Sequence, residues 1–331
     1  MNIPDPAIVL DLIHGFRRSK TMFTAVRMGV FDQLQLGPAG AADMAARLGA
    51  SPDGMERLLD GCAALGLLSK QDGLYSNQPV AEHYLCADGP HTLRGYIVYS
   101  DDALYPMWNH LEDAVREGKP RWKHTFGIEG DIFSGFFRSE AAMRDFLHGM
   151  HEFGMLTSPA VATAFDLSRF RRIVDLGGAT GHLAMAACER YPEMRGVVFD
   201  LQRVVRMAAT PHERVEFLAG DFFEDELPSG DLYAMGRILH DWCEEKIQRL
   251  LARIFAKLPA GGAVLIAEML LEDDGVGPVP ANMQSLNMLV VAEGRERSLP
   301  EYRRLLEGAG FAHVEGKRTG LTLDAVLAVK G

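Results

Sequence analysis

Apolar residues recur at helical intervals through the first third of the chain. Ser51 suits the N-cap of one of these helices, and Pro52 suits its first turn. A hairpin tip follows at residues 71–76. This order of elements predicts an all-helical winged-helix domain over residues 1–100. The predicted helices cover residues 8–13, 22–26, 41–48 and 51–67.

Short apolar runs alternate with helical patterns from about residue 170 to the end of the chain. A capping box at Ser298 and Glu301 starts one helix, and Gly310 lies just past it. This alternation predicts a Rossmann-like, doubly wound α/β domain over residues 101–331, with a helical lead-in to about residue 165. The predicted strands cover residues 173–176, 197–200, 215–219, 231–235, 263–268, 313–317 and 323–329, and the predicted helices cover residues 182–191, 202–209 and 244–258.

Composition and charge narrow the class of partner. The chain has 331 residues, of which 47% are hydrophobic, and its net charge is −11. Nucleic-acid-binding domains carry a basic face, and the candidate recognition helix carries Asp53, Glu56 and Asp60 with Arg57 as its cation. We therefore expect no nucleic-acid partner and interpret the winged helix as a dimerisation module, although a DNA-binding regulator stays an alternative.

The four cysteines are far apart and form no CxxC pair, which is typical of reduced thiols in a cytoplasmic protein. The chain has no apolar run of the roughly 18 residues that a membrane span needs, and its N-terminus does not resemble a signal peptide. We expect a cytoplasmic protein with no membrane partner.

Acidic residues end three successive predicted strands. Asp175 lies in the first, Asp200 ends the second and Asp221 follows the third. Open parallel sheets bind ligands outside the carboxyl ends of their strands, so these carboxylates are expected in one crevice. A glycine turn formed by Gly177, Gly178 and Gly181 follows the first strand. Strand-end aspartates also cap helices, and that is the alternative interpretation of each one taken singly.

The turn does not fit the dinucleotide pattern GxGxxG, because Ala179 stands where its second glycine belongs. The carboxylates would also repel a pyrophosphate. The pattern D-x-G-x-x-x-G instead favours S-adenosylmethionine, which has an adenosine but no phosphate. Asp200 would accept hydrogen bonds from the ribose, Asp221 would accept one from the adenine amino group, and Phe222 would pack on the adenine ring.

Residues 95–165 are rich in aromatic side chains, most of which we expect in the core. His148 and His151 lie one turn apart in this segment. No carboxylate or thiol at suitable spacing completes a metal site with them, so we expect no metal.

Several segments in combination resemble the class I S-adenosylmethionine-dependent O-methyltransferases of the caffeate and acetylserotonin (hydroxyindole) type. They are VDLGG at residues 174–178, VFD at 198–200, AGDFF at 219–223 and RILHDW at 237–242. SLNML at 285–289, EGRER at 293–297 and DAVLA at 324–328 are most similar to the acetylserotonin O-methyltransferase-like proteins. The resemblance covers nearly the whole chain, and it implies an antiparallel last strand and an intertwined homodimer through the N-terminal domain.

The resemblance also assigns roles to residues. It makes His240 the general base, Glu296 the carboxylate that orients it, and Glu268 a group on the other side of the acceptor. A surface ion pair of these glutamates with Arg295 or Arg297 is the alternative. Phe137 and Gly154 align with cofactor-contacting positions of the helical segment. The full cofactor set, with S-adenosylhomocysteine as product, is Asp175, Gly177, Gly178, Gly181, Asp200, Leu201, Gly220, Asp221, Phe222 and Arg237.

Methionine and aromatic side chains suit a flat aromatic acceptor. The candidate acceptor residues are Asp241, Met150, Phe153, Met283, Asn287 and Met288, several of which would serve equally well in the core. The sequence thus predicts O-methylation of a small aromatic hydroxyl compound with His240 as base. Methylation at nitrogen or carbon, and another cofactor-assisted reaction on a polyketide-like ligand, are the alternatives within enzymes.

Overall fold

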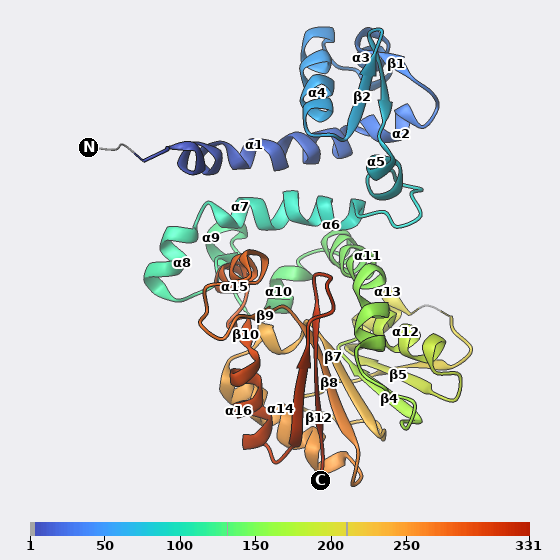
Figure 1. Cartoon of the computed structure of the whole chain (residues 1–331), viewed down its shortest axis with the longest axis vertical. Helices are drawn as coiled ribbons and strands as arrows, with labels where there is room; N and C mark the ends of the chain where they lie inside the picture. The colour runs from blue at the N-terminus through green and yellow to red at the C-terminus, as the bar shows by residue number, and fades with distance from the viewer. Residues whose placement is uncertain (1–3, 131, 210) are drawn as a thin grey trace. The chain divides into compact units, whose positions relative to one another are not determined.

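The computed structural model describes residues 4–130, 132–209 and 211–331. The chain separates into two compact units, Met1–Ala103 and Leu104–Gly331. Each unit has its own elements, shown in Figure 1. Among the described residues, no helix is both long enough and apolar enough to cross a membrane.

The first unit combines helices with a small sheet. Its helices are α1 (Ala7–Met28), α2 (Val30–Leu34), α3 (Ala41–Leu48), α4 (Pro52–Ala64), α5 (Pro79–Tyr84) and α6 (Arg94–Tyr99). The sheet has the order β1 (Ala39–Gly40), β3 (Leu74–Asn77), β2 (Leu68–Gln71), and both pairings are antiparallel. The helical domain with its hairpin is confirmed, and the one difference from the expectation is that the hairpin also pairs with an extra short strand, β1.

The helix start at Ser51 and Pro52 is as the sequence predicts. The Ser51 side chain accepts a hydrogen bond from the Gly54 N–H, which caps α4, and Pro52 occupies the first turn. The two apolar stretches at residues 8–13 and 22–26 belong to one continuous helix, α1. Its second half packs into the core of the unit, which also contains Phe31 and Tyr75.

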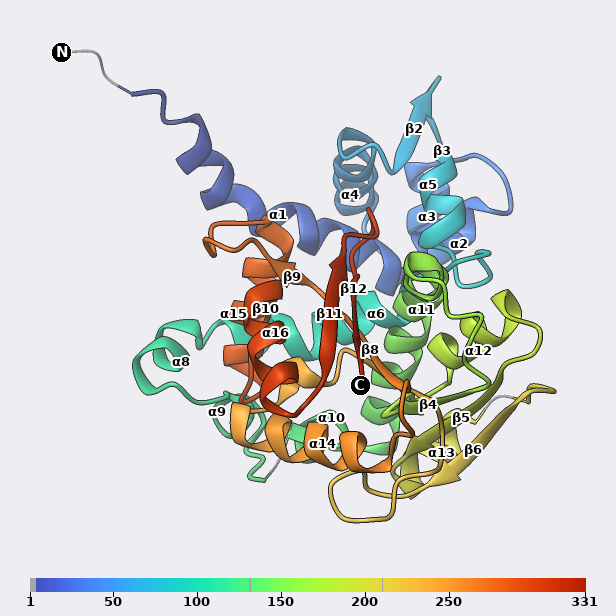
Figure 2. The ribbon, with the colours of Figure 1, turned by 60° about the horizontal axis from the view of Figure 1, so that its bottom comes forward.

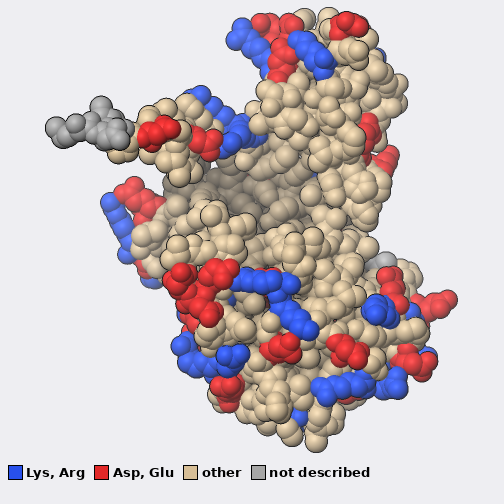
Figure 3. Space-filling view, in the orientation of Figure 1, with Lys and Arg blue, Asp and Glu red and all other residues tan. Residues whose placement is uncertain are grey.

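The charges around α4 do not form a basic face. Arg57 pairs with Asp53 at 3.1 Å, and Lys70 on the hairpin pairs with Asp60 at 2.6 Å. Basic and acidic side chains lie next to one another over α4 and β2 in Figure 3. Since these cations are already neutralised by neighbouring carboxylates, this surface does not offer the unpaired positive charge that phosphate binding requires.

The second unit begins with helices. The short π-helix η1 (Ser100–Leu104) spans the boundary between the units. The helices that follow are α7 (Tyr105–Trp108), α8 (Leu111–Glu117), α9 (Trp122–Phe126), α10 (Ile132–Phe136) and the long helix α11 (Glu140–Ala164). Ser139 caps α11 by accepting a hydrogen bond from the Ala142 N–H. This helical segment supplies the aromatic side chains that line the cavity described below.

A seven-stranded sheet forms the centre of this unit, in the order β11-β12-β8-β7-β4-β5-β6. β12 is antiparallel to both of its neighbours, whereas the pairings among β8, β7, β4, β5 and β6 are parallel. The strands are β4 (Arg172–Leu176), β5 (Arg195–Asp200), β6 (Val215–Ala219), β7 (Leu232–Gly236), β8 (Ala263–Glu268), β11 (Ala312–Lys317) and β12 (Asp324–Val329).

Helices cover both faces of the sheet. Figures 1 and 2 show α11, α12 (His182–Arg190) and α13 (Gln202–Ala208) on one side, with α14 (Glu244–Lys257) and α16 (Leu299–Gly308) on the other. The predicted capping box of Ser298 and Glu301 starts α16. The remaining elements are the 3₁₀ turn η2 (Leu239–Asp241), the short parallel pair β9 (Leu270–Leu271) and β10 (Arg297–Ser298), and α15 (Val279–Val291). The parallel strands bring the ends of β4 to β7 to one edge of the sheet.

Candidate active site

A cavity of about 510 Å³ lies at this edge, inside the second unit. Its wall combines the ends of β5 and β7 and the residues after β6 with the helical segment α10–α11. Phenylalanine and tryptophan side chains recur in the lining, together with aliphatic ones. The lining includes Phe133, Phe136, Phe137, Phe146, Met150, Phe153, Gly154, Gly177, His182, Asp200, Leu201, Gly220, Asp221, Phe222, Phe223, Arg237, Asp241 and Trp242.

Asp200 holds the glycine turn in place. Its Oδ2 accepts a hydrogen bond from the Ala179 N–H at 2.9 Å, and its Oδ1 accepts one from the Leu201 N–H at 2.7 Å. Burial raises the pKa of Asp200 to about 6. Gly177 has a φ of +68°, and a Cβ there would lie 2.5 Å from Ile238 Cδ1. The turn therefore brings bare backbone to the cavity wall, and each Asp200 oxygen keeps the capacity to accept a second hydrogen bond.

The residues after β6 form the next part of the wall. Gly220 packs against the Phe199 ring, which a Cβ at residue 220 would overlap. Asp221 Oδ1 accepts a hydrogen bond from the Phe223 N–H at 2.8 Å. Gly220, Asp221 and Phe222 all line the cavity. This hydrogen bond stabilises the turn after β6, where no helix begins among the described residues before β7, and Asp221 also lines the cavity.

Three residues of the predicted cofactor set do not line the cavity: Asp175, Gly178 and Gly181. Asp175 is buried under the turn, where its Oδ2 accepts a hydrogen bond from the Ala184 N–H of α12 at 3.3 Å. Burial raises the pKa of Asp175 to about 7. A Cβ on Gly178 would lie 2.5 Å from Asp175 Cγ. In this structure these residues shape the turn from behind.

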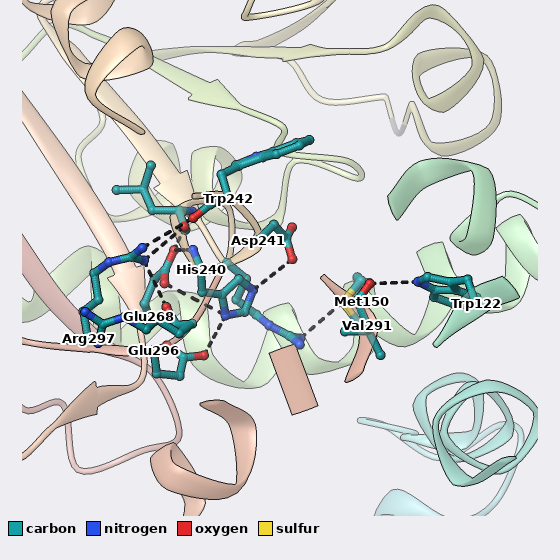
Figure 4. A network of polar contacts seen from close by, with 12 residues as sticks. Trp122, Met150, His240, Asp241, Trp242, Glu268, Val291, Glu296 and Arg297 are labelled. Atoms are coloured by element: carbon teal, nitrogen blue, oxygen red, sulfur yellow. Dashed lines mark hydrogen bonds and ion pairs between the residues drawn. The ribbon is translucent and has the colours of Figure 1, made fainter. Parts of the chain in front are cut away.

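His240 lies in the turn η2 after β7, and its side chain is buried. Its Nδ1 is 2.6 Å from Glu296 Oε1, and its Nε2 is 3.8 Å from Asp241 Oδ1. Figure 4 shows Glu296 on the Nδ1 side of the ring and Asp241 on the Nε2 side. When Glu296 is ionised, its Oε1 accepts a hydrogen bond from His240 Nδ1–H, and this leaves the Nε2 lone pair free to accept a proton.

Burial dominates the acidity of the carboxyl groups around His240. It raises the pKa of Glu296 to about 8 and that of Asp241 to about 6, and it also raises the pKa of Glu268. Glu296 Oε2 has no hydrogen-bond partner among the described residues. The ionised form of this buried carboxylate is therefore stabilised when the neighbouring His240 ring becomes positively charged.

Glu268, which the resemblance places on the other side of the acceptor, is held by hydrogen bonds from the protein, and its role toward the acceptor stays a prediction. Its Oε1 accepts hydrogen bonds from the Leu239 and His240 N–H groups at 2.7 and 3.1 Å. Its Oε2 accepts one from the Tyr302 hydroxyl at 2.7 Å. Glu268 ends β8 with its side chain behind the turn η2, where it fixes the backbone that carries His240.

Neither glutamate forms the surface ion pair that was the alternative. Both are buried, and Arg295 pairs instead with Glu301 at 2.6 Å. The ligand atoms of His240, Glu268 and Glu296 all lie within 4.8 Å of one another, which is close enough to hold a metal ion. Because both Glu268 oxygens already accept protein N–H or O–H groups, this set is arranged for hydrogen bonding rather than for coordination.

The candidate acceptor residues fall into two groups. Met150, Phe153 and Asp241 line the cavity. The Arg237 guanidinium lies over the Phe153 ring at 4.7 Å, and its Nη1 is 3.2 Å from Met150 Sδ. The other three candidates, on α15, are not among the lining residues: Asn287 Oδ1 accepts a hydrogen bond from Trp108 Nε1 at 2.9 Å, Met283 is exposed and Met288 is buried.

Sequence reasoning missed part of the cavity wall. His182 and Trp242 line it but were not candidates, and the aromatic side chains of α10 and α11 were assigned mainly to the core. Phe137 and Gly154, which only the resemblance singled out, do line the cavity. The aromatic enrichment of the helical segment was the available signal. We expected no metal at His148 and His151. His151 Nδ1 lies 2.9 Å from Thr180 Oγ1.

Comparison with known proteins decides the family. A model of the O-methyltransferase domain matches residues 108–312, and one of the O-methyltransferase dimerisation domain matches residues 10–87. The chain belongs to the O-methyltransferase family. The enzyme is 42% identical to acetylserotonin O-methyltransferase of Bos taurus, over 98% of this chain and 97% of that protein.

Two further relatives extend this comparison. A human protein described as a probable bifunctional dTTP/UTP pyrophosphatase/methyltransferase is 43% identical over 99% of this chain. The match covers 54% of the length of that human protein. The crystal structure of human N-acetylserotonin methyltransferase in complex with S-adenosylmethionine has a TM-score of 0.96 and 39% identity, with coverage of 100% of this chain and 99% of that one. The enzyme is an S-adenosylmethionine-dependent O-methyltransferase.

The residues of the cavity fit this cofactor. Asp200 can accept ribose hydroxyls in addition to its two backbone N–H groups, and bare glycine backbone lies beside it. The aromatic wall suits an adenine ring, and no phosphate has to be placed against the carboxylates. A volume of about 510 Å³ is that of a small-molecule site.

Proposed function

We propose that this enzyme methylates a hydroxyl group of a small aromatic molecule and that His240 is the general base. The observation that carries the proposal is the buried 2.6 Å contact between His240 Nδ1 and Glu296 Oε1, beside the cavity. A phenol is a weak nucleophile until its proton leaves. A histidine whose tautomer is set by a carboxylate can remove that proton from its other nitrogen.

The cofactor, when bound, supplies an electrophilic methyl group on a sulfonium. Asp200 would hold the ribose, Asp221 the adenine amino group, and Phe222 the ring face. His240 Nε2 accepts the hydroxyl proton, and Glu296 stabilises the imidazolium that results. Glu268 keeps the turn η2 in position through two backbone N–H groups. Proton removal of this kind contributes roughly 10²–10⁴ in rate, and alignment of the two reactants contributes much of the rest.

We propose that the acceptor is flat and aromatic because the cavity is lined by phenylalanine and tryptophan side chains and by Met150. Asp241 would accept a hydrogen bond from a polar group of the acceptor. Asn287, Met283 and Met288 remain proposed acceptor residues on α15. The relatives named acetylserotonin O-methyltransferase make a hydroxylated indole one candidate acceptor.

We further propose a homodimer that forms through the first unit. The first half of α1 carries large apolar side chains that are exposed: the exposed fraction is 71% for Ile8, 73% for Leu12 and 55% for Phe16. A second copy of the same helix would bury this surface. All four cysteines are free, which supports a cytoplasmic location.

The test is a panel of phenols and hydroxyindoles with S-adenosylmethionine, with product mass and methyl position determined. We expect O-methyl products. His240→Ala should lower kcat by roughly 10²–10⁴-fold without changing S-adenosylhomocysteine affinity, because the proposed contacts to the cofactor come from Asp200, Asp221 and Phe222 and not from the base. Asp200→Ala, the matched control, should instead lose that affinity. Methyl groups found on nitrogen or carbon, or full activity of His240→Ala, would reject the proposal.

A further inference from the structure

His182 occupies space in the cavity wall that is open because residue 154 is glycine. His182 is the first residue of α12, directly after the glycine turn, and Gly154 lies on α11. A Cβ at residue 154 would overlap Cγ, Cδ2 and Cε1 of the imidazole. The ring therefore lies face-on against the Gly154 backbone, and both residues line the cavity.

The contact of His182 with Ser158 favours one position of the ring proton. Nδ1 lies 2.8 Å from Ser158 Oγ, which is buried one turn further along α11. Among the described residues the structure gives this hydroxyl no second partner. The arrangement that uses the hydroxyl proton has Ser158 donate to Nδ1, and this places the ring proton on Nε2.

The Nε2–H group is available to a ligand. Nε2 has no hydrogen-bond partner among the described residues. It is also not among the fully buried side-chain atoms that lack a partner, so the atom is accessible. Because His182 lines the cavity, this donor is open to it. Burial lowers the pKa of His182 to about 4, so the ring is neutral near pH 7 and keeps the single-donor form.

We propose that His182 Nε2–H donates a hydrogen bond to the α-carboxylate of the methionine part of S-adenosylmethionine. The inference rests on the proposed orientation, in which Asp200 and Asp221 hold the adenosine and the methyl group faces the turn η2. The methionine tail is then left with α11 and the start of α12. Its sulfonium and ammonium groups are positively charged and do not accept a hydrogen bond from an N–H donor, whereas its carboxylate does.

The position at the start of α12 favours the same group. α12 has nine residues, and its aligned backbone dipoles give its N-terminal end a partial positive charge, with the Ala184 N–H of the first turn already donated to Asp175. The His182 Nε2–H donor, held between Ser158 and Gly154, adds a directed hydrogen bond to this electrostatic attraction. His182, Ser158 and Gly154 therefore form one recognition unit for the amino-acid end of the cofactor.

Calorimetric titration with two ligands tests this assignment. S-adenosylhomocysteine has the carboxylate, and 5′-methylthioadenosine keeps the adenosine and sulfur but lacks the amino-acid end. His182→Phe fills the same space without a donor, and we expect it to weaken S-adenosylhomocysteine binding by about tenfold (about 1.4 kcal/mol) while methylthioadenosine binding stays within about twofold. His182→Gln, whose amide N–H replaces the Nε2 donor, should restore most of the loss.

Ser158→Ala is a second, milder variant that leaves the ring in place and frees Nδ1. We expect a smaller loss for S-adenosylhomocysteine and none for methylthioadenosine. Equal weakening of both ligands by His182→Phe would mean that the ring only packs, and no weakening of either would mean that another group holds the carboxylate. Both results overturn the proposal. The readout is binding without acceptor, so it is independent of the proposed aromatic substrate and of His240.

Discussion

Individual carboxyl groups in this enzyme owe their properties to where the fold buries them. Asp175, Asp200 and Glu296 are all nearly inaccessible to water, and burial raises the pKa of each to between about 6 and about 8. Glu296 differs from the two aspartates in its partner, since it contacts a side chain that can become positively charged. It is the one of the three that we place in the proton transfer.

Glu296→Gln tests that role. The amide oxygen can still accept a hydrogen bond from His240 Nδ1–H, so the tautomer is preserved. The negative charge that stabilises the imidazolium is lost. We expect kcat to fall by roughly 10²–10⁴-fold at unchanged affinity for S-adenosylhomocysteine. Glu293→Gln, in the same loop but paired with Lys246 at 2.7 Å, should keep kcat within about twofold. Equal losses in the two variants would contradict the role of Glu296.

Asp175 makes a prediction about stability and pH. Its folded-state pKa of about 7 is above its unfolded value of 3.8. Its stabilising contribution is therefore complete below the unfolded pKa and is lost as pH rises through about 7. Asp175→Asn cannot ionise, so the variant should gain stability relative to the wild type by about 2–3 kcal/mol between about pH 5 and about pH 8.

Urea unfolding of the cofactor-free protein at both pH values measures this difference. The wild type serves as the reference at each pH, which cancels the contributions of all other groups. A stability difference that does not change with pH would show that Asp175 is ionised in the folded protein at both values.

At the scale of elements, one loop positions the base. Residues 293–297 connect α15 to β10, and the Glu293 N–H donates to the Asp241 carbonyl in η2. The buried Arg297 donates to the carbonyls of Leu239 and Trp242. Gly294 contacts the same turn so closely that a Cβ would lie 2.6 Å from the Trp242 nitrogen. The loop and Glu268 thus hold η2 from two sides.

Gly294→Ala should disturb this contact. We expect a loss of about 1–3 kcal/mol in unfolding free energy, because the added methyl group meets backbone that cannot rotate away, together with a lower kcat. Gly308→Ala, at the end of α16, where a Cβ would make ordinary van der Waals contact at 3.5 Å from Gln248 Nε2, should be neutral or slightly stabilising. Thermal unfolding and initial rates of both variants measure the difference. A Gly294→Ala protein as stable and active as Gly308→Ala would refute the tight contact.

At the scale of the whole molecule, the first unit leaves the first half of its longest helix, α1, exposed. The exposed apolar half of α1 exceeds what a stable monomer normally leaves in water. The match of residues 10–87 to a dimerisation domain agrees with this observation.

Ile13→Asp tests the homodimer. We expect light scattering after size exclusion to give twice the chain mass for the wild type and to shift toward the monomer mass for the variant, because the buried carboxylate would be unpaired. Leu321→Asp replaces another apolar side chain of similar exposure, in the loop before β12, and should leave the mass unchanged. A wild type that is monomeric at micromolar concentration would rule out the homodimer.

The sequence by itself determined the order of elements and the edge of the sheet that binds the cofactor. Strand and helix periods are local properties, and the rule that parallel sheets bind ligands at their carboxyl ends needs only the strand order. These sufficed to bring Asp200 and Asp221 to the cavity. The resemblance added His240 and Glu296, whose contact joins segments 56 residues apart.

Only the tertiary structure decided which way side chains at that edge point. Successive residues of a strand face opposite sides of the sheet, so the end of a strand places a residue at an edge but not in a crevice. Asp175 consequently faces α12 and Glu268 lies behind η2, although both belong to strands that end at the site. The fit of His182 against Gly154 depends on how α11 packs on α12, which no local pattern encodes.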